Sequence, residues 1–394
     1  MQQGEVRRFS LREVEGLVAE VARGRITRQQ FIVKGLALGL SAASVGTVLA
    51  ACGSSGSTAE PSASASPTPM DTTMPDKLVF YNWSDSLDPA LAKGFESQYG
   101  LKLVQPVYAS NEELLAKLKS GITGYDVINP SDFMVTIMAK TGLLRPLDLS
   151  LLPNLKNAVP ALQQPSFDPG TDGTKYSVPY GYGATAIAVR TDVITALVDS
   201  WSAMWEPAYK NNIAMFDGER ECFSAALFLL GYSPNTTEAA QIEEAKHKLI
   251  EQKPLLRKYT GDPKRDVVNG MGLVQCWDGD VVLAKRTVGT EKVGWVLPKE
   301  GYMMFADGIS ICANSTRPYA AHLFLNYLMD SKVAAQEENW SGYQMACADP
   351  SLVEDPILKS MAMTTEQLAA GTFPVDLGEF ASVVSDAWTQ VKSA

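Results

Sequence analysis

The chain has 394 residues, of which 46% are hydrophobic, enough for two domains with buried cores and too many for a wholly disordered chain. The net charge is −10, from 34 Lys and Arg against 44 Asp and Glu. The first 51 residues hold seven of the basic and four of the acidic residues, so residues 52–394 carry 27 basic against 40 acidic residues, a net charge of −13. Such an acidic chain would repel a phosphate backbone, so we expect no nucleic-acid partner.

The N-terminal segment has the pattern of an export signal. Residues 35–51 are a run of apolar and small residues that follows Arg28 and Lys34, as in secretory signal peptides. The run ends in Leu49-Ala50-Ala51-Cys52, which resembles the lipobox of bacterial lipoproteins, where the cysteine is acylated and becomes the new N-terminus. We therefore expect residues 1–51 to be a lipoprotein-type signal and Cys52 to anchor the chain in the lipid bilayer, at the outer face of the cell membrane or in the periplasm. The export route, Sec or twin-arginine, stays open.

A tether is expected next, because residues 52–75 are dominated by Ser, Ala, Pro, Thr and Gly without apolar periodicity. Four cysteines follow in the exported chain: Cys222, Cys276, Cys312 and Cys347. They could pair in three ways, and the sequence does not choose among these or exclude free buried thiols.

The remainder, residues 76–394, alternates strand and helix patterns. In chain order we expect a strand at 77–82, a helix at 89–99, a strand at 101–107, a helix at 111–119 capped by Asn111, a strand at 125–128 and a helix at 132–140. Further strands are expected at 184–189, 213–216, 272–277, 293–297 and 308–312, and further helices at 219–230, 238–250, 278–286 and 318–329. This alternation predicts an α/β fold with parallel sheets, divided into two lobes, whose ligand would sit at the carboxyl ends of the strands.

Motifs for catalysis and cofactor binding are absent. We find no G-x-S-x-G, H-E-x-x-H or P-loop, and we expect no cofactor and no metal site. The sequence Gly181–Ala186 matches a dinucleotide-binding loop only loosely and precedes a strand instead of following one, so we interpret it as a turn between lobes. A secreted, lipid-anchored hydrolase remains an alternative, but its base would have to come from His247, expected in solvent, or His322, expected at a helix boundary.

Acids and aromatics recur at the ends of the predicted strands. They follow strands in Asn82-Trp83-Ser84-Asp85, Pro130–Phe133, Phe216–Glu221 and Cys276–Asp280, and Phe305–Asp307 stands just before another strand. Carboxylates pair with ammonium groups, and aromatic faces attract cations and cover methylenes, so the pattern suits a basic ligand with an apolar stem. Each group also has a plainer explanation, since Glu221 and Asp280 could favour a helix N-terminus and Trp277 could belong to the core.

From about Leu78 to Lys392 the chain resembles the spermidine- and putrescine-binding proteins of bacterial ABC importers. The segments that carry the resemblance are Phe80-Tyr81-Asn82-Trp83, Ser110-Asn111-Glu112, Lys117-Leu118, Pro179-Tyr180, Gly183–Ile187, Arg220-Glu221, Leu230–Ser233, Asn235-Thr236-Thr237 and Pro298–Gly301. The resemblance implies a two-lobed, type II periplasmic-binding-protein fold with a hinged cleft. Residues 76–185 and 306–350 would form lobe 1, and residues 186–305 and 351–394 lobe 2.

The resemblance also implies a set of ligand-binding residues: Trp83, Ser84, Asp85, Ser131, Glu221, Trp277, Asp280, Phe305, Asp307 and Tyr343. Trp83-Ser84-Asp85, Phe305 and the acid at Asp280 follow the putrescine type. The spermidine type has a second acid where this chain has Gly218, although Ser86 departs from both types, which tend to have tyrosine there.

The expected function is therefore binding, not catalysis. A monomeric, lipid-anchored binding protein would capture a polyamine, with a putrescine-like diamine favoured over spermidine, and deliver it to an ABC permease in the membrane. A binding protein for another small solute is the alternative within the same class.

Overall fold

The computed structural model describes residues 70–84, 86–168, 170 and 173–394, and the described part forms one compact unit. The predicted signal, most of the tether, Cys52 and Asp85 lie outside the described residues. Within the described part, no helix combines the length and the apolar character needed to cross a bilayer.

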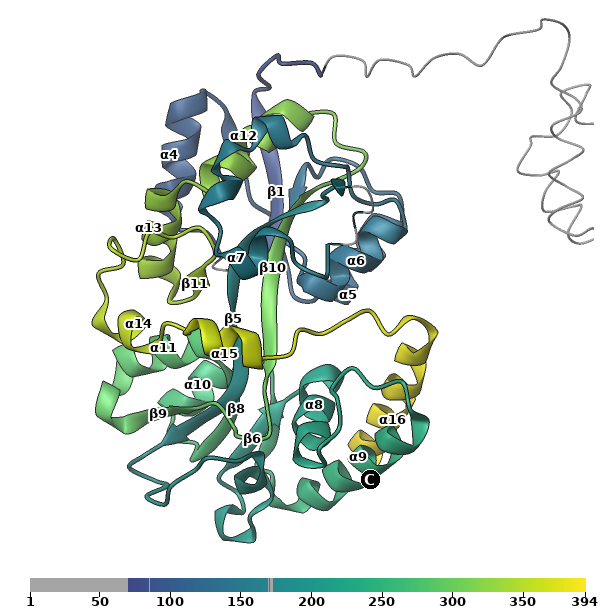
Figure 1. Ribbon diagram of the computed structural model, residues 1–394, viewed down its shortest axis with the longest axis vertical. Helices are drawn as coiled ribbons and strands as arrows, with labels where there is room; N and C mark the ends of the chain where they lie inside the picture. The colour runs from purple at the N-terminus through teal and green to yellow at the C-terminus, as the bar shows by residue number, and fades with distance from the viewer. Residues whose placement is uncertain (1–69, 85, 169, 171–172) are drawn as a thin grey trace, which may run out of the picture. The chain divides into compact units, whose positions relative to one another are not determined.

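A mixed sheet forms the centre of the structure (Figure 1). Its strands run in the order β2 (Lys102–Val104), β1 (Lys77–Trp83), β4 (Val127–Ile128), β10 (Met303–Ile311), β5 (Ser177–Arg190), β8 (Leu273–Trp277), β6 (Ile213–Phe216) and β7 (Lys258–Thr260). Three shorter strands lie off this path: β3 (Val107–Tyr108) pairs with β1, while β9 (Val293–Val296) and β11 (Gln344–Met345) pair with β5.

The sheet has two parallel halves joined by two long antiparallel strands. In the first half β1 pairs in parallel with β2, β3 and β4, and in the second half β6 pairs in parallel with β7 and β8. Strands β5 and β10 pair antiparallel to each other, with a register shift between Ala306 and Gly308, and run from one half to the other. The ends of the parallel strands that carry the predicted ligand-binding residues therefore face the junction formed by β5 and β10.

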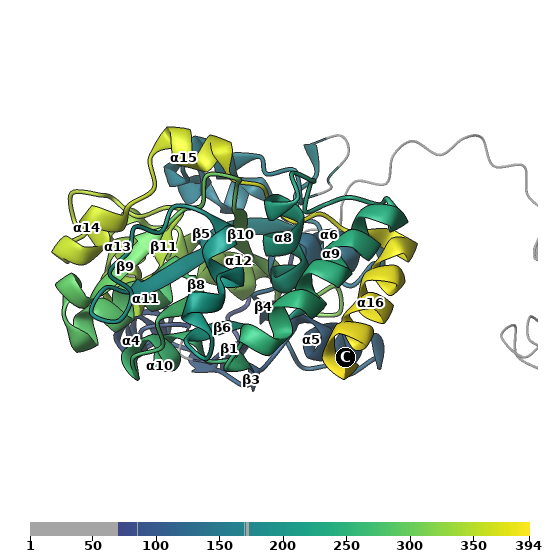
Figure 2. The same ribbon diagram turned by 90° about the horizontal axis from the view of Figure 1, so that it is seen from below.

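Helices cover both halves. Around the first half lie α4 (Pro89–Tyr99), α5 (Asn111–Lys119), α6 (Asp132–Lys140), α7 (Pro160–Gln163), α12 (Pro318–Leu328) and α13 (Ser331–Ser341). Around the second lie α8 (Glu219–Leu229), α9 (Ala239–Gln252), α10 (Pro263–Val268), α11 (Asp278–Val288) and α16 (Ala381–Ser393). The short helices α14 (Pro356–Met361) and α15 (Thr365–Ala370) lie between the two groups, and Figure 2 shows α8, α9 and α16 on one side with α11 and α14 on the other.

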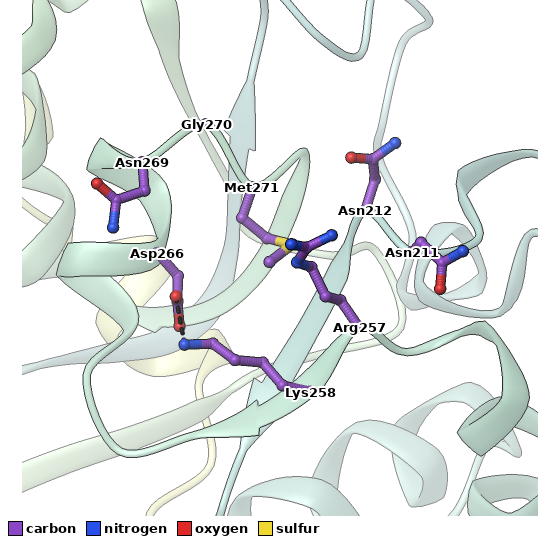
Figure 3. Close-up of a pocket in the computed structure, with 8 residues that line it drawn as sticks. All are labelled: Asn211, Asn212, Arg257, Lys258, Asp266, Asn269, Gly270 and Met271. Atoms are coloured by element: carbon purple, nitrogen blue, oxygen red, sulfur yellow. Dashed lines mark ion pairs between the residues drawn. The ribbon is translucent and has the colours of Figure 1, made fainter.

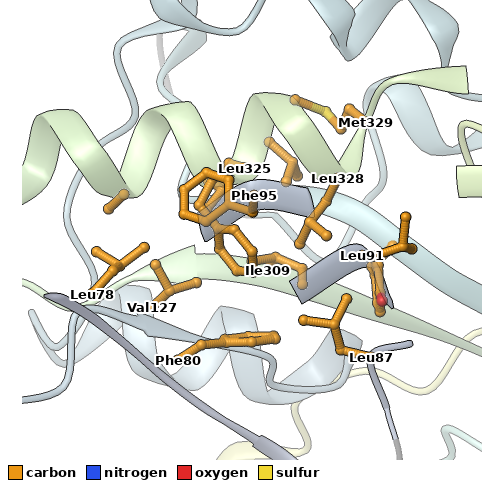
Figure 4. Packing of buried hydrophobic residues seen from close by; sticks show 14 of the residues in the cluster. Leu78, Phe80, Leu87, Leu91, Phe95, Val127, Ile309, Leu325, Leu328 and Met329 are labelled. Carbon is orange, nitrogen blue, oxygen red and sulfur yellow. The ribbon is translucent and has the colours of Figure 1, made fainter. Parts of the chain in front are cut away.

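Each half has its own hydrophobic core. In the first core Phe80 of β1 and Phe95 of α4 lie among Leu325, Leu328 and Ile309 (Figure 4). The ring centroids of Phe80 and Phe95 lie 5.1 and 4.8 Å from that of Phe324 of α12. In the second core Trp201 and Phe223 are buried among α8, α9 and α16. Burying a side chain of this size contributes about 1.5–3 kcal/mol, so each half can be held by its own interior.

Several sequence-based expectations need correction. Ser110, not Asn111, caps α5, because its side chain accepts a hydrogen bond from the Glu113 amide at 3.1 Å. The segment Gly181–Ala186 is not a turn but the middle of β5, whose fourteen residues are all buried. His322 is not a boundary residue: it is fully buried, and its Nε2 accepts a hydrogen bond from the Asp148 amide at 2.9 Å.

The side chain of His247 is mostly exposed, as expected for a residue on a charged helix. The state of the cysteines, which the sequence left open, is given by the structure: Cys222, Cys276, Cys312 and Cys347 are all free and buried.

Candidate ligand-binding site

Trp83 stands at the carboxyl end of β1 and is held there by a buried polar network. Its indole Nε1 donates to the Asn129 carbonyl at 2.9 Å, and the Tyr108 hydroxyl donates to the same oxygen. The Trp83 and Tyr108 rings lie with centroids 4.5 Å apart. The half-buried indole therefore has a fixed orientation, whereas Ser84, the next residue, is exposed.

Ser131 and Asp307 come together from distant parts of the chain. Ser131 precedes α6, and its Oγ accepts from Asn111 Nδ2 at 3.1 Å and donates to Asp307 Oδ1 at 3.3 Å. Asp307 lies within β10, where an isolated antiparallel bridge pairs it with Ser131. Burial raises the pKa of Asp307 to about 7, and the Ser131 hydrogen bond opposes this rise. A cationic group beside this carboxylate would offset the free-energy cost of keeping its negative charge in a buried position.

Asp280, Tyr343 and Phe305 form a second group. Asp280 lies in the first turn of α11, and its Oδ1 accepts from the Tyr343 hydroxyl at 2.9 Å. A Cβ on Gly279 would overlap the Tyr343 ring, so glycine allows this ring to lie directly on the helix start. Phe305 meets Tyr343 edge to face, with centroids 6.1 Å apart. Burial raises the pKa of Asp280, and the Tyr343 bond lowers it.

Glu221 and Trp277 form the third group, in the second half of the sheet. The Trp277 ring, at the end of β8, packs on Phe216 at 4.5 Å. Gln275 Nε2 donates to the Glu221 carbonyl at 2.7 Å, and its Oε1 accepts from the Phe216 amide at 3.3 Å, which joins β6, β8 and α8. The Glu221 carboxylate lies over Gly218, where a Cβ would collide with it.

The charge on Glu221 is opposed from both halves of the structure. Burial raises its pKa, Arg220 lowers it, and Glu112 of α5 raises it further. Glu112 belongs to a helix of the first half and Glu221 to a helix of the second, so like charges face the same region from both sides.

These groups are connected through shared elements. Phe305 and Asp307 are two residues apart on β10, and Trp277 and Asp280 flank the start of α11. Tyr343, which follows α13, contacts both Asp280 and Phe305. The three groups thus contain seven of the ten predicted residues. Trp83 stands by itself at the end of β1, Ser84 is exposed, and Asp85 is not described.

Sequence reasoning missed two buried acids here. Asp278 accepts from the amides of Gly279 at 2.8 Å and Ala184 at 3.3 Å and from Gln344 Nε2 at 3.2 Å, and burial raises its pKa to about 7. Asp132, at the start of α6, accepts from the Phe133 amide at 2.7 Å and the Ala306 amide at 3.3 Å. These hydrogen bonds tie β5 and β11 to α11 through Asp278, and β10 to α6 through Asp132. Their position beside Trp277 and Ser131 was the only signal in the sequence.

The described residues offer no metal site, and their surface hollow lies away from the three groups. No group of three or more His, Cys, Asp or Glu there could hold a metal ion. A surface hollow of about 440 Å³ lies at the starting ends of β6, β7 and β8, where Lys258 Nζ pairs with Asp266 Oδ1 at 2.5 Å (Figure 3). This hollow shares no residue with the three groups above.

Comparisons with known proteins agree with this arrangement. Residues 90–365 match the family described as bacterial extracellular solute-binding protein. The spermidine/putrescine-binding periplasmic protein of Salmonella typhimurium is 33% identical over 329 residues, which cover 81% of this chain and 92% of that protein. The putrescine-binding periplasmic protein PotF of Escherichia coli is 32% identical over 342 residues, which cover 80% of this chain and 91% of that protein. The crystal structure of the TpPotD lipoprotein of Treponema pallidum superposes with a TM-score of 0.73 at 27% identity, over 80% of this chain and 99% of the other.

The resemblance seen in the sequence and the two-lobed α/β fold that it implied are thereby confirmed. The relatives are binding proteins and not enzymes, which sets the hydrolase alternative aside. The chain belongs to the family of bacterial extracellular solute-binding proteins.

Proposed function

We propose that this protein is a lipid-anchored, extracytoplasmic binding protein of an ABC importer that captures a polyamine and favours a putrescine-like diamine over spermidine. The observation that carries the proposal is the set of three half-buried acids, Glu221, Asp280 and Asp307, each with a pKa raised first of all by burial. Each stands beside an aromatic ring or on an element that carries one. The names of the relatives, which bind spermidine, putrescine or cadaverine, support the same ligand class.

The chemistry of capture follows from these acids. Each ammonium group of a diamine offers three donors to carboxylates whose charge is costly without a partner. Charge-assisted hydrogen bonds of this kind contribute about 1.5–3 kcal/mol each. The rings of Trp277, Phe305 and Trp83 would cover the methylene stem and hold the ammonium ends by cation–π attraction.

Lobe closure would complete the site. Lobe 1 would comprise residues 76–185 and 306–350 and lobe 2 residues 186–305 and 351–394, with β5 and β10 as the crossing strands. A ligand that neutralises Glu221 would relieve its repulsion with Glu112 and so favour the closed arrangement. A membrane permease would then receive the ligand from the closed monomer.

The preference for a diamine rests on Gly218 and Asp280. Gly218 stands where spermidine-type relatives carry a second acid, and the Glu221 carboxylate occupies the space above it. Asp280 supplies an acid in the position that resembles the putrescine type. With glycine at position 218, the acid that would serve an additional amine in the spermidine type is missing.

Calorimetry with putrescine, cadaverine, spermidine and spermine tests the proposal. We expect putrescine to bind most tightly, and binding no tighter than about millimolar by all four would overturn the function. Gly218→Asp, whose Cβ would push the flexible end of Glu221 aside, should raise the affinity for spermidine relative to putrescine. Ala208→Asp, at an exposed position before β6, adds the same charge at the opposite end of that strand from Glu221 and should leave the ratio unchanged.

The proposed anchor is tested separately, because Cys52 lies outside the described residues. Mass spectrometry of the exported protein should show an N-terminal cysteine with two or more acyl chains, and Cys52→Ala should release the protein from the membrane. Deletion of the gene should abolish growth on putrescine as sole nitrogen source if the protein serves import.

A further inference from the structure

Arg286 joins two helices that belong to different halves of the structure. From α11, its Nε pairs with Asp355 Oδ2 at 2.6 Å. Its Nη2 donates to the Asn339 carbonyl at 2.8 Å and its Nη1 to the Trp340 carbonyl at 3.3 Å. These carbonyls lie in the last turn of α13, where carbonyl groups have no partner within the helix and a cation is favourable. One planar guanidinium thus holds three acceptors from two segments.

The chain leaves α13 directly toward the proposed ligand. Gly342 ends the helix in the left-handed conformation, with φ 84°, and Tyr343 follows. The Tyr343 ring lies on Gly279, and its hydroxyl donates to Asp280. Residues 339–343 are therefore fixed to α11 at two points, by Arg286 near its end and by Asp280 near its start.

The two helices are otherwise built into separate cores. Ala334 of α13 belongs to the first core, whereas Val281 and Ala284 of α11 pack with β8 and β9 in the second half. Between them Val282 and Ala335 meet in a small apolar cluster with Val353 and Leu358. Ala348, Ile357 and Met361 pack against its rim. These apolar contacts are not directional, whereas the hydrogen bonds of Arg286 fix which turn of α13 lies on α11.

We propose that Arg286 is a positioning residue for diamine binding: it holds the last turn of α13 on α11, so that the Tyr343 hydroxyl stays on Asp280 and directs the carboxylate toward an ammonium group. The inference rests on the proposed function, and it assigns to Arg286 no contact with the ligand.

A double-mutant cycle tests the inference. Arg286→Met should weaken putrescine binding by about fivefold or more in the otherwise unchanged protein. In a Tyr343→Phe background the same substitution should change the affinity by less than about twofold, since the hydroxyl that it positions is gone. Arg145→Met is the matched control, because Arg145 also holds two carbonyls, those of Ala313 and Ser315, away from Asp280. It should lower the melting temperature without changing the affinity.

Unchanged affinity in Arg286→Met, or equal losses in both backgrounds, would overturn the inference. If Arg286→Met does not fold, Arg286→Lys serves in the same cycle. Lysine keeps a cation near Asp355 but cannot reach all three acceptors in the same geometry. The expected loss is smaller and again confined to the protein that has Tyr343.

A readout without ligand separates this inference from the proposed function. Asp280 also feels Lys264, which lowers its pKa, and Asp262, which raises it, but these residues are not held by Arg286. Loss of the Tyr343 bond should therefore raise the pKa of Asp280 in Arg286→Met as it does in Tyr343→Phe, measured by NMR of ¹³C-labelled aspartate. If the wild-type protein binds no diamine, the proposed function fails, while this titration still decides the role of Arg286: an unshifted Asp280 overturns it.

Discussion

Asp307 shows how one residue can couple ligand binding to pH. Its carboxyl is half-buried, accepts a hydrogen bond from Ser131, and has a pKa raised to about 7 by burial. An ammonium group requires the charged form, so the ligand must displace the proton wherever the pH lies below this value. The same property that makes Asp307 costly in the empty protein makes it selective for a cation.

Diamine affinity should therefore fall as the pH decreases below about 7, by up to about tenfold for each pH unit from this carboxyl alone. Asp307→Asn should weaken binding at about pH 8 by at least about 1.5 kcal/mol, since a charge-assisted hydrogen bond is lost. It should also flatten the pH profile. Calorimetry across about pH 5.5–8.5 checks both effects, and an unchanged slope in Asp307→Asn would exclude this carboxyl as the source.

At the scale of an element, the start of α11 carries the densest set of site contacts. Asp278 ties it to β5 and β11, Gly279 receives the Tyr343 ring, and Asp280 receives the Tyr343 hydroxyl. Because these three residues contact β5, β11 and Tyr343, the helix start can hardly shift without moving the site.

Gly279→Ala tests this close approach. The added methyl group would push the Tyr343 ring away from the helix, at a cost in stability of about 1–3 kcal/mol, typical of overpacking. Putrescine binding should weaken by about tenfold, which corresponds to about 1.4 kcal/mol. Gly261→Ala, with open space around its Cβ position and no unusual φ, should change neither quantity. Wild-type affinity in Gly279→Ala would show that Tyr343 does not need this contact.

The elements also show where sequence patterns suffice and where they fail. Helix α4 begins at Pro89 and ends before Gly100, as its proline, its apolar period and its terminal glycine predict. The sequence predicts only residues 184–189 of strand β5, because the residues before them include Pro179, Gly181 and Gly183, which usually mark turns. All of its residues are buried, so its sequence lacks the alternation of apolar and polar residues by which a half-exposed strand is recognised.

The residues of the site also differ in whether the sequence alone reveals them. Glu221, Trp277 and Asp280 follow strands in the sequence and could be recognised from that position. Arg286 could not, since its role depends on α13 reaching α11 from more than 50 residues further along the chain. Contacts at such separations leave no local signal in a single sequence.

For the whole molecule, the number of buried acids sets the dependence of stability on pH. Besides Asp307 and Asp278, the neighbouring acids Glu337 and Glu338 of α13 have pKa values raised by burial to about 7. Between their usual pKa values and about 7 the folded state keeps protons that the unfolded state releases. Their contribution is therefore complete at low pH and is lost as the pH rises through about 7.

The urea midpoint of the ligand-free protein should accordingly fall as the pH is raised from about 5.5 to about 8. Glu338→Gln keeps an acceptor for the Met345 amide but cannot titrate, so it should reduce this dependence. Glu354→Gln, at an exposed position in the loop before α14, controls for the change in net charge. A midpoint independent of pH in the wild-type protein would contradict the prediction.

The long strands that join the two halves have a consequence for the order in which the chain can fold. Strand β4 ends at Ile128, but its neighbour β10 begins only at Met303, after almost the whole second half has been made. At about 5–20 residues per second, a ribosome needs on the order of ten to thirty seconds to span that interval. Throughout it β4 has an unpaired edge and the first core lacks α12 and α13. The N-terminal lobe is thus begun first during synthesis but cannot be completed before most of its partner exists.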